Sequence, residues 1–252
     1  MTRLTEFTCS ALFTCRKSQI ALESVKADTQ GVSISNLAFS ILAMPLNFSG
    51  QNKRGHSFKG QDLSEANFSY ADIQSTDFSG ANLNSANLDG VNLKSADLRG
   101  ANLYGVNLRG ADLRGAKLSC ANLDGANLEG VNLDGANLDS ANLFGVNLFG
   151  ANLDGANLSS ANLSRVNLKS ANLFGVNLSR ANLTNANLDG ANLEYADLES
   201  ANLDGASLSG ANLEYTNLTK IVWNENTRWQ DVRVGETAIN VPQALLEQNQ
   251  ST

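Results

Sequence analysis

The sequence is poor in the residue types that carry most enzyme chemistry. It has 252 residues, of which one is histidine and three are cysteine. A Ser–His–Asp triad would have to be built around His56 alone, and the cysteines lack zinc-binding spacing. We find no phosphate-binding loop or dinucleotide fingerprint, and the scattered aspartates form no calcium loop. The sequence therefore predicts no enzyme, no cofactor and no metal site.

A long apolar run is also lacking. The apolar stretch 32–46 is broken by serine and asparagine and is too short to span a bilayer. The first residues lack the ordered parts of a signal peptide. Cys9, Cys15 and Cys120 are an odd set, which favours free thiols in a reducing compartment. We therefore predict a cytoplasmic protein without a membrane span.

A five-residue unit fills most of the chain. Alanine or valine, asparagine or aspartate, leucine and two variable residues repeat from residue 46 to residue 220, and we number these places 1 to 5. Five helical steps of about 100° would scatter the place 3 side chains around a helix, which excludes an α-helix. Five is odd, so a straight strand would send successive leucines to opposite faces. The chain must therefore bend once per repeat.

Glycine supports a bend at place 5. Apart from Gly31 and Gly235, each glycine occupies the last place of a quintet, where a turn would demand a positive φ. Repeated bends that turn every place 3 side chain toward one interior predict a solenoid.

These quintets resemble the pentapeptide repeat family, including its cyanobacterial-type members. Ala81-Asn82-Leu83 and Ala121-Asn122-Leu123 match the family consensus, and the resemblance covers about 70% of the chain. It implies an all-β fold, a right-handed quadrilateral β-helix of about nine coils in which places 1 and 3 point inward.

The flanks differ from the repeat. We predict an N-terminal extension or cap over residues 1–45, the β-helix over 46–220 and a C-terminal cap over 221–252, with short helices in both flanks. Trp223 and Trp229 are the predicted end cap. Met44 stands just before the first quintet, and we hypothesise that the native protein starts there, which would leave residues 1–43 as an extension that is not part of it.

Outward places carry whatever specificity the rod has. Lys94, Arg99, Arg109, Arg114 and Lys117 form a basic belt, followed by an acidic belt of Asp124, Glu129, Asp134 and Asp139. Opposite charges one coil apart predict cross-strand ion pairs on a soluble rod, namely Arg109 with Asp89 and Glu129, and Arg114 with Asp134. The candidate partner surface consists of outward aromatic residues: Tyr104, Phe144, Phe149, Phe174, Tyr195 and Tyr215.

Two functional classes follow. The first is a non-catalytic scaffold that binds another protein through its outward residues. The second comes from the resemblance, since some members mimic a DNA duplex and bind DNA gyrase; the net charge of −7 is compatible, whereas the basic belt interrupts the acidic surface. Direct binding of nucleic acid is disfavoured by the acidic balance. The C-terminal Trp and Tyr residues make a homodimer through a terminal coil conceivable.

Overall fold

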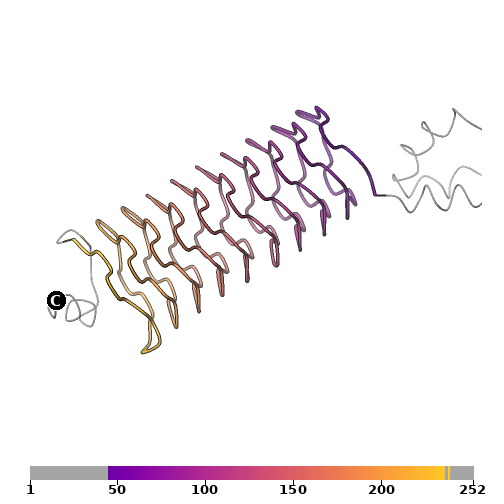
Figure 1. The fold of residues 1–252 in the computed structure, drawn as a ribbon. Helices are drawn as coiled ribbons and strands as arrows, with labels where there is room; N and C mark the ends of the chain where they lie inside the picture. The colour runs from indigo at the N-terminus through magenta and orange to yellow at the C-terminus, as the bar shows by residue number, and fades with distance from the viewer. Residues whose placement is uncertain (1–44, 236–237, 239–252) are drawn as a thin grey trace, which may run out of the picture. The chain divides into compact units, whose positions relative to one another are not determined.

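The computed structural model describes residues 45–235 and residue 238. The chain divides into two units, Met1–Leu46 and Asn47–Thr252, and the repeat lies in the second. Figure 1 shows the repeat as an uninterrupted stack of similar coils. The predicted short helices, the hypothesised start at Met44, and Cys9 and Cys15 all lie outside the described residues.

Each coil is held to the next by single bridges. The described residues contain no helix and no extended strand, because each quintet contributes only its place 2 residue to a parallel bridge. Bridge partners are 20 residues apart, from Asn47↔Asn67 to Asn202↔Val222. Four quintets therefore complete one coil and give it four faces. We name the faces by their first bridge residues: the Asn47, Asn52, Ser57 and Asp62 faces.

A tight turn separates consecutive faces. The place 1 N–H donates to the place 3 carbonyl of the preceding quintet, as in Gln51 N to Phe48 O at 3.0 Å. Place 5, the third residue of this turn, has a φ of 53° to 69° in every quintet from Gly50 to Lys220, as in a type II turn. The predicted positive φ is confirmed. It also explains why place 5 holds no Val, Ile or Thr, which pay most for this conformation.

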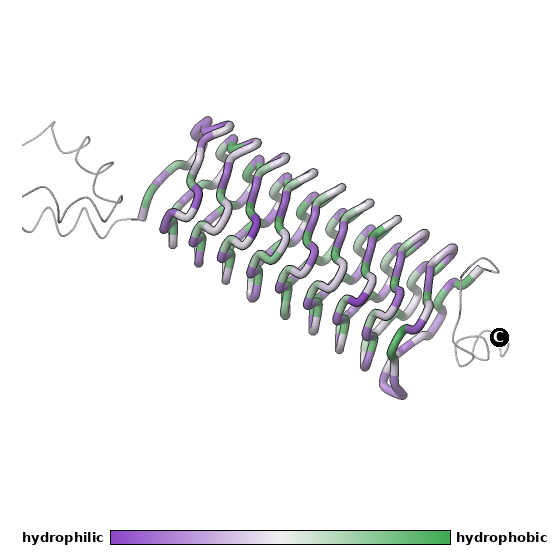
Figure 2. Tube along the Cα trace, turned by 180° about the vertical axis from the view of Figure 1, so that it is seen from behind, coloured by the Kyte–Doolittle hydropathy of each residue, from purple (hydrophilic) through white to green (hydrophobic). Residues whose placement is uncertain are grey.

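Places 1 and 3 form the core. From Leu63 to Leu218 every place 3 residue is buried, and the place 1 residues, which are alanine or valine except for Thr76 and Thr216, fill the space between them. Figure 2 shows apolar and polar segments alternating within every coil. Near the N-terminal end four phenylalanines take the inward places; Phe48 stacks on Phe68 at 4.6 Å and Phe58 on Phe78 at 5.1 Å.

The bridge ladder continues beyond the end of the repeat sequence. Ser207 bridges Arg228 and Asn212 bridges Arg233, each 21 residues apart instead of 20. The turn from Asn224 to Thr227 accommodates the additional residue; Asn224 N donates to Thr227 Oγ1 at 3.1 Å. The repeat sequence thus ends at residue 220, whereas the bridges extend to Arg233.

Candidate interaction surface

Place 2 side chains position the outward residues. Asn142 Oδ1 accepts a hydrogen bond from Phe144 N at 3.3 Å, which holds the turn, and another from Asn162 Nδ2 at 2.9 Å. Its own Nδ2 donates to Asn122 Oδ1 at 3.0 Å, so asparagines one coil apart form a ladder. Aspartate can replace the turn acceptor but has no side-chain N–H to donate. The side chains at places 4 and 5 therefore project from a turn that is held by the place 2 side chain, which is itself bonded to the coils before and after it.

The six predicted aromatic residues are all exposed, with exposed fractions between 37% for Phe144 and 52% for Tyr195. The structure does not bring them together on one face. Tyr104 and Phe144 lie on the Asp62 face, and Phe149 lies on the Asn47 face. The Asn52 face carries Phe174, Tyr195 and Tyr215. Tyr70, at 67% the most exposed of the large apolar residues described, was not among the predicted residues.

Three aromatic side chains on the Asn52 face form a ladder. Tyr195 stacks on Tyr215 with ring centroids 4.6 Å apart and an interplanar angle of 4°, as the shared column predicts. Phe174 meets Tyr195 edge to face at 5.3 Å. Elsewhere, the Arg165 guanidinium lies 5.6 Å from the centroid of Phe144, within the range of a cation–π contact. These contacts limit the rotamers of the exposed rings.

The basic belt is paired mostly within its own quintets. Arg114 Nη2 lies 2.6 Å from Asp112 Oδ2, so the predicted pairing of Arg114 with Asp134 one coil away is wrong. The arginine at place 4 has a carboxylate at place 2 of its own quintet, and it binds this nearer group instead of the carboxylate one coil away. Arg99 binds Asp97 in the same way, and these arginines lower the pKa of Asp97 and Asp112.

One predicted cross-coil pair does form. Arg109 Nε lies 3.3 Å from Asp89 Oδ1, where place 2 of the same quintet is Asn107 and offers no carboxylate. The pattern of pairs thus depends on whether place 2 is aspartate or asparagine.

The last coils are acidic. Residues 181–219 contain Asp and Glu but no Lys or Arg. Their acidic residues are Asp189, Glu194, Asp197, Glu199, Asp204 and Glu214. Most of these side chains are partly exposed, so the rod presents a negative surface toward its C-terminal end.

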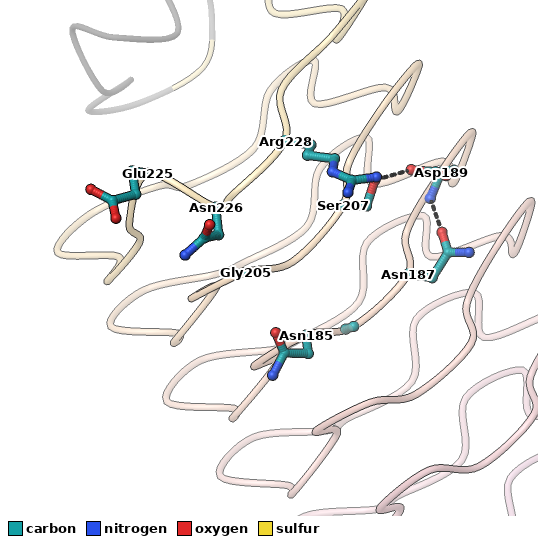
Figure 3. A pocket seen from close by; sticks show the side chains of 9 residues that line it. Asn185, Asn187, Asp189, Gly205, Ser207, Glu225, Asn226 and Arg228 are labelled. Atoms are coloured by element: carbon teal, nitrogen blue, oxygen red, sulfur yellow. Dashed lines mark hydrogen bonds between the residues drawn. The ribbon is translucent and has the colours of Figure 1, made fainter.

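A hollow of about 630 Å³ lies where the regular repeat ends (Figure 3). Asn185 and Gly205 line it on one side, Glu225 and Asn226 extend over it, and Arg228 lies beside Ser207 and Asp189 on the other (Figure 3). The hollow was not predicted from the sequence, in which the loss of the five-residue phase after Lys220 is the visible signal.

The contacts in the hollow are structural. Ser207 Oγ donates to Asp189 Oδ1, which also accepts from Ser209 N at 3.1 Å. Asp189 N in turn donates to Asn187 Oδ1 at 3.0 Å. The serine hydroxyl is thus directed to a carboxylate that already holds a backbone turn. No histidine stands beside it, since His56 is at the other end of the ladder.

The two predicted cap residues contact each other. Trp229 is 2% exposed and Trp223 is 36% exposed, and their rings meet edge to face at 6.2 Å. Trp229 Nε1 is the buried side-chain polar atom that has no hydrogen-bond partner among the described residues. Whether residues beyond 235 complete a cap lies outside what the structure describes, so the cap stays a prediction.

The described part of the chain offers no catalytic constellation. The His56 ring nitrogen Nδ1 lies 3.4 Å from the Arg54 carbonyl oxygen, and the ring has no carboxylate partner among the described residues. Within the described ranges, no three His, Cys, Asp or Glu side chains are grouped to hold a metal ion. Over the same residues, no helix has the length and apolar character needed to cross a membrane. What the surface provides is fixed aromatic rings and banded charge.

Comparisons with known proteins agree with this architecture. Segments between residues 47 and 219 match the model of a family described as pentapeptide repeats, with eight copies. The crystal structure of HetL, a pentapeptide repeat protein involved in heterocyst differentiation regulation from the cyanobacterium Nostoc sp. strain PCC 7120, is 32% identical over 81% of this chain and 95% of that chain, with a TM-score of 0.35. No match was found among curated proteins.

Two further structures are similar. Rfr23, a pentapeptide repeat protein from the cyanobacterium Cyanothece 51142, is 35% identical over 45% of this chain and 90% of that chain, with a TM-score of 0.44. QnrB1, a plasmid-mediated fluoroquinolone resistance protein, is 19% identical over 80% of this chain and 98% of that chain, with a TM-score of 0.67, and this likeness shows the fold alone. The chain belongs to the pentapeptide repeat family, and its four-faced ladder is the right-handed quadrilateral β-helix of that family.

Proposed function

We propose that this protein is a non-catalytic recognition rod that binds another protein through its exposed aromatic residues. The observation that carries the proposal is the position of those residues. Tyr104, Phe144 and Phe149 project from place 4 of fixed turns, at 51%, 37% and 45% exposure. Aromatic side chains of this kind supply large contact area at low entropic cost and are enriched where proteins bind each other.

The frame supports this role. The turn N–H at place 4 is held by the place 2 side chain, as in Phe149 N to Asn147 Oδ1 at 3.3 Å. A partner would therefore meet side chains whose backbone is already ordered, which reduces the entropy lost on binding. Phe144 and Phe149 leave the same coil from adjacent faces, so one partner can contact both rings by lying over the edge between them.

A pull-down from a native extract tests the proposal. The bait is the wild-type protein or the Phe144→Ser, Phe149→Ser variant, each confirmed to be folded by its thermal melt. We expect a specific partner to be retained by the wild type and lost with the serine variant. Phe144→Tyr with Phe149→Tyr is the matched control, because tyrosine keeps the ring and place 4 already holds Tyr104.

The same partner bound equally by the serine variant would contradict the proposal for this edge. Phe174→Ser, made separately, then asks whether the aromatic ladder on the Asn52 face carries the contact instead. We place the interaction in a reducing cytoplasm, because Cys120 is an exposed free thiol and thiols persist in such compartments.

Mimicry of DNA toward gyrase is the second candidate. The stretch of residues 181–219 without Lys or Arg favours it, because a duplex mimic must present negative charge. The basic belt counts against it, since Arg99 and Arg109 are about 60% exposed in the middle of the rod. A gyrase supercoiling assay separates the two functions: inhibition or protection of gyrase supports mimicry, and unchanged supercoiling leaves the recognition rod.

A further inference from the structure

The place 4 column of the Asn52 face is divided by charge. Its N-terminal half contains three basic side chains and no acidic one, and its C-terminal half contains four acidic side chains and no basic one. In chain order the column reads Arg54, Gln74, Lys94, Arg114, Asp134, Asp154, Phe174, Glu194 and Glu214. The change of sign falls between Arg114 and Asp134.

Three charged side chains at the centre of this column make no direct contact with an opposite charge, although Lys94 is attracted to Asp112 and Asp134 to Arg114 at longer range. Among the described residues, the side chains of Lys94, Asp134 and Asp154 make no hydrogen bond or ion pair. Arg114 is bound to Asp112, but a guanidinium has five N–H donors and can accept a second carboxylate. Phe174 lies in the same column and is 38% exposed. The column thus combines unpaired charges of both signs with an exposed ring.

We propose that the Asn52 face is a self-association surface on which two copies of this chain pack side by side and antiparallel. A two-fold axis in the contact plane, perpendicular to the rod, lays each column against its own reverse. With the axis between Arg114 and Asp134, those two residues face each other across the contact. Lys94 then faces Asp154, and Arg54 faces Glu194.

The charges select this register. Moving the axis by half a coil brings Arg114 against Arg114 of the second copy, or Asp134 against Asp134. Moving it by a full coil brings Arg114 against Lys94, or Asp134 against Asp154. A parallel arrangement would place every charge against its own copy. Like charges in contact are unfavourable, so the antiparallel register with three opposite pairs, each formed twice, is preferred.

The neighbouring columns fit the same register. At place 5, Tyr195 of one copy faces Gly55 of the other, so the ring meets a position without a side chain. At place 4, Phe174 faces the uncharged Gln74. At place 2, Asp112 faces Asn132, and Asp72 faces Asn172. None of these positions brings two like charges together.

The other faces match less well. On the Asn47 face, an axis through Phe149 places Arg109 against Asp189 and Glu129 against Lys169, which gives two opposite pairs, and Arg109 is already bound to Asp89 of its own chain. The place 4 column of the Asp62 face contains no basic residue. On the Ser57 face, the register that places Arg99 against Asp139 leaves Lys59 facing Ser179. Among the described residues, the Asn52 face thus offers the largest number of opposite pairs in one register, three against two on the Asn47 face.

Sedimentation velocity of the full chain tests the proposal. We expect the mass of two chains at low salt and of one chain in about 1 M NaCl, where the Debye length is about 3 Å. Lys94→Asp and Asp154→Lys should each raise the dimer dissociation constant at least about tenfold, because each creates two like-charge contacts. The double variant restores opposite charges and should recover the dimer. Lys169→Asp, on the Asn47 face, should leave it unchanged.

A cysteine pair tests the register. In a background without native cysteines (Cys9→Ser, Cys15→Ser, Cys120→Ser), Gln74→Cys and Phe174→Cys should give a disulfide-linked dimer on mild oxidation. The two positions are five coils apart, about 24 Å within one chain, so they cannot link internally. Ser79→Cys with Ser179→Cys occupies the same coils on the Ser57 face and should not link.

Three outcomes would overturn the proposal. The first is the mass of one chain at low salt. The second is a dimer whose dissociation constant is unchanged in either single charge-reversal variant. The third is a dimer of the Gln74→Cys, Phe174→Cys variant in which no disulfide forms between the two chains on oxidation. The last two would indicate association through another surface, such as a terminal coil.

Discussion

The ring of Tyr70 lies against the backbone of Gly90, one coil further along the chain. A Cβ atom at residue 90 would stand 2.6 Å from Tyr70 Cε1 and 2.7 Å from Cδ1. The ring is held there because Tyr70 Oη donates to Asp89 Oδ2 at 2.9 Å, a bond that raises the pKa of Tyr70. Gly90 therefore has a steric role in addition to its positive φ.

Replacing Gly90 with alanine should cost more than the same change at Gly80. Both glycines have a φ near 60°, but a Cβ at Gly80 meets nothing within 4 Å. Both variants pay roughly 1 kcal/mol for the left-handed conformation. Gly90→Ala must also displace the Tyr70 ring, so we expect about 1 kcal/mol of further destabilisation in thermal unfolding. Equal melting temperatures for the two variants would show that the ring moves freely.

Lys53 occupies place 3, an inward place that later quintets give to leucine. Its ammonium lies 5.9 Å from the centroid of Phe48, and the side chain is only partly buried. Lys53→Leu should stabilise the first coil by about 1 kcal/mol, since it adds apolar contact and removes a charge at the edge of the core. We expect the melting temperature to rise by about 2–4 °C. Lys59→Leu, at an outward place, is the control; an equal rise there would mean that loss of charge alone explains the effect.

The five-residue period was sufficient to predict a solenoid because one small set of contacts is used in every coil. Inward leucine and the turn at place 5 depend on residues that recur, so each quintet supports the same interpretation, whereas the four faces and their handedness were expected from the family resemblance. Ion pairs were predicted less well. Arg114 has Asp134 in its column and Asp112 in its own quintet, and only side-chain geometry shows which carboxylate it binds.

The sequence predicted that the six candidate aromatic residues are exposed, but it did not predict that they lie on three different faces. The sequence places Phe144 and Phe174 outward, while the 20-residue coil assigns them to different faces. The hollow beside Arg228 depends on a single additional residue between Val222 and Arg228, a shift that a pattern of five cannot place. A repeating pattern cannot predict local geometry that departs from the repeat.

Asp97 should make the protein sensitive to acid. It accepts bonds from Arg99 Nε at 2.8 Å and from Arg99 Nη2, and these bonds lower its pKa in the folded state. A lowered pKa stabilises the fold at every pH above the unfolded value, near 3.9, and this contribution is lost as the pH falls through the folded value.

Asp97→Asn should therefore destabilise the protein at pH 7 by less than about 1 kcal/mol, because the pair is partly exposed. The difference from wild type should shrink as the pH falls below the unfolded value and Asp97 becomes protonated. Asp154→Asn, whose side chain has no hydrogen-bond partner among the described residues, should change little at neutral pH. A constant difference between Asp97→Asn and wild type at all pH values would exclude the ionised carboxylate as its cause.

The asparagine ladder gives a prediction in which the expected effect depends on one proton. In Asn142→Asp, the carboxylate still accepts from Asn162 and from Phe144 N, but it has nothing to donate to Asn122 Oδ1, 3.0 Å away. Two acceptors then face each other, and we expect a loss of about 1–2 kcal/mol at pH 7. Facing an acceptor raises the pKa of the new carboxyl group, since the protonated form can donate and the ionised form cannot. The loss should therefore shrink as the pH falls and the group protonates, provided each variant is compared with wild type at the same pH.

Asn84→Asp is the control, because the Asn84 side chain accepts from Ser85 Oγ and donates no hydrogen bond among the described residues. An equal loss in both variants would mean that negative charge on the rod, and not the missing donor, accounts for the change.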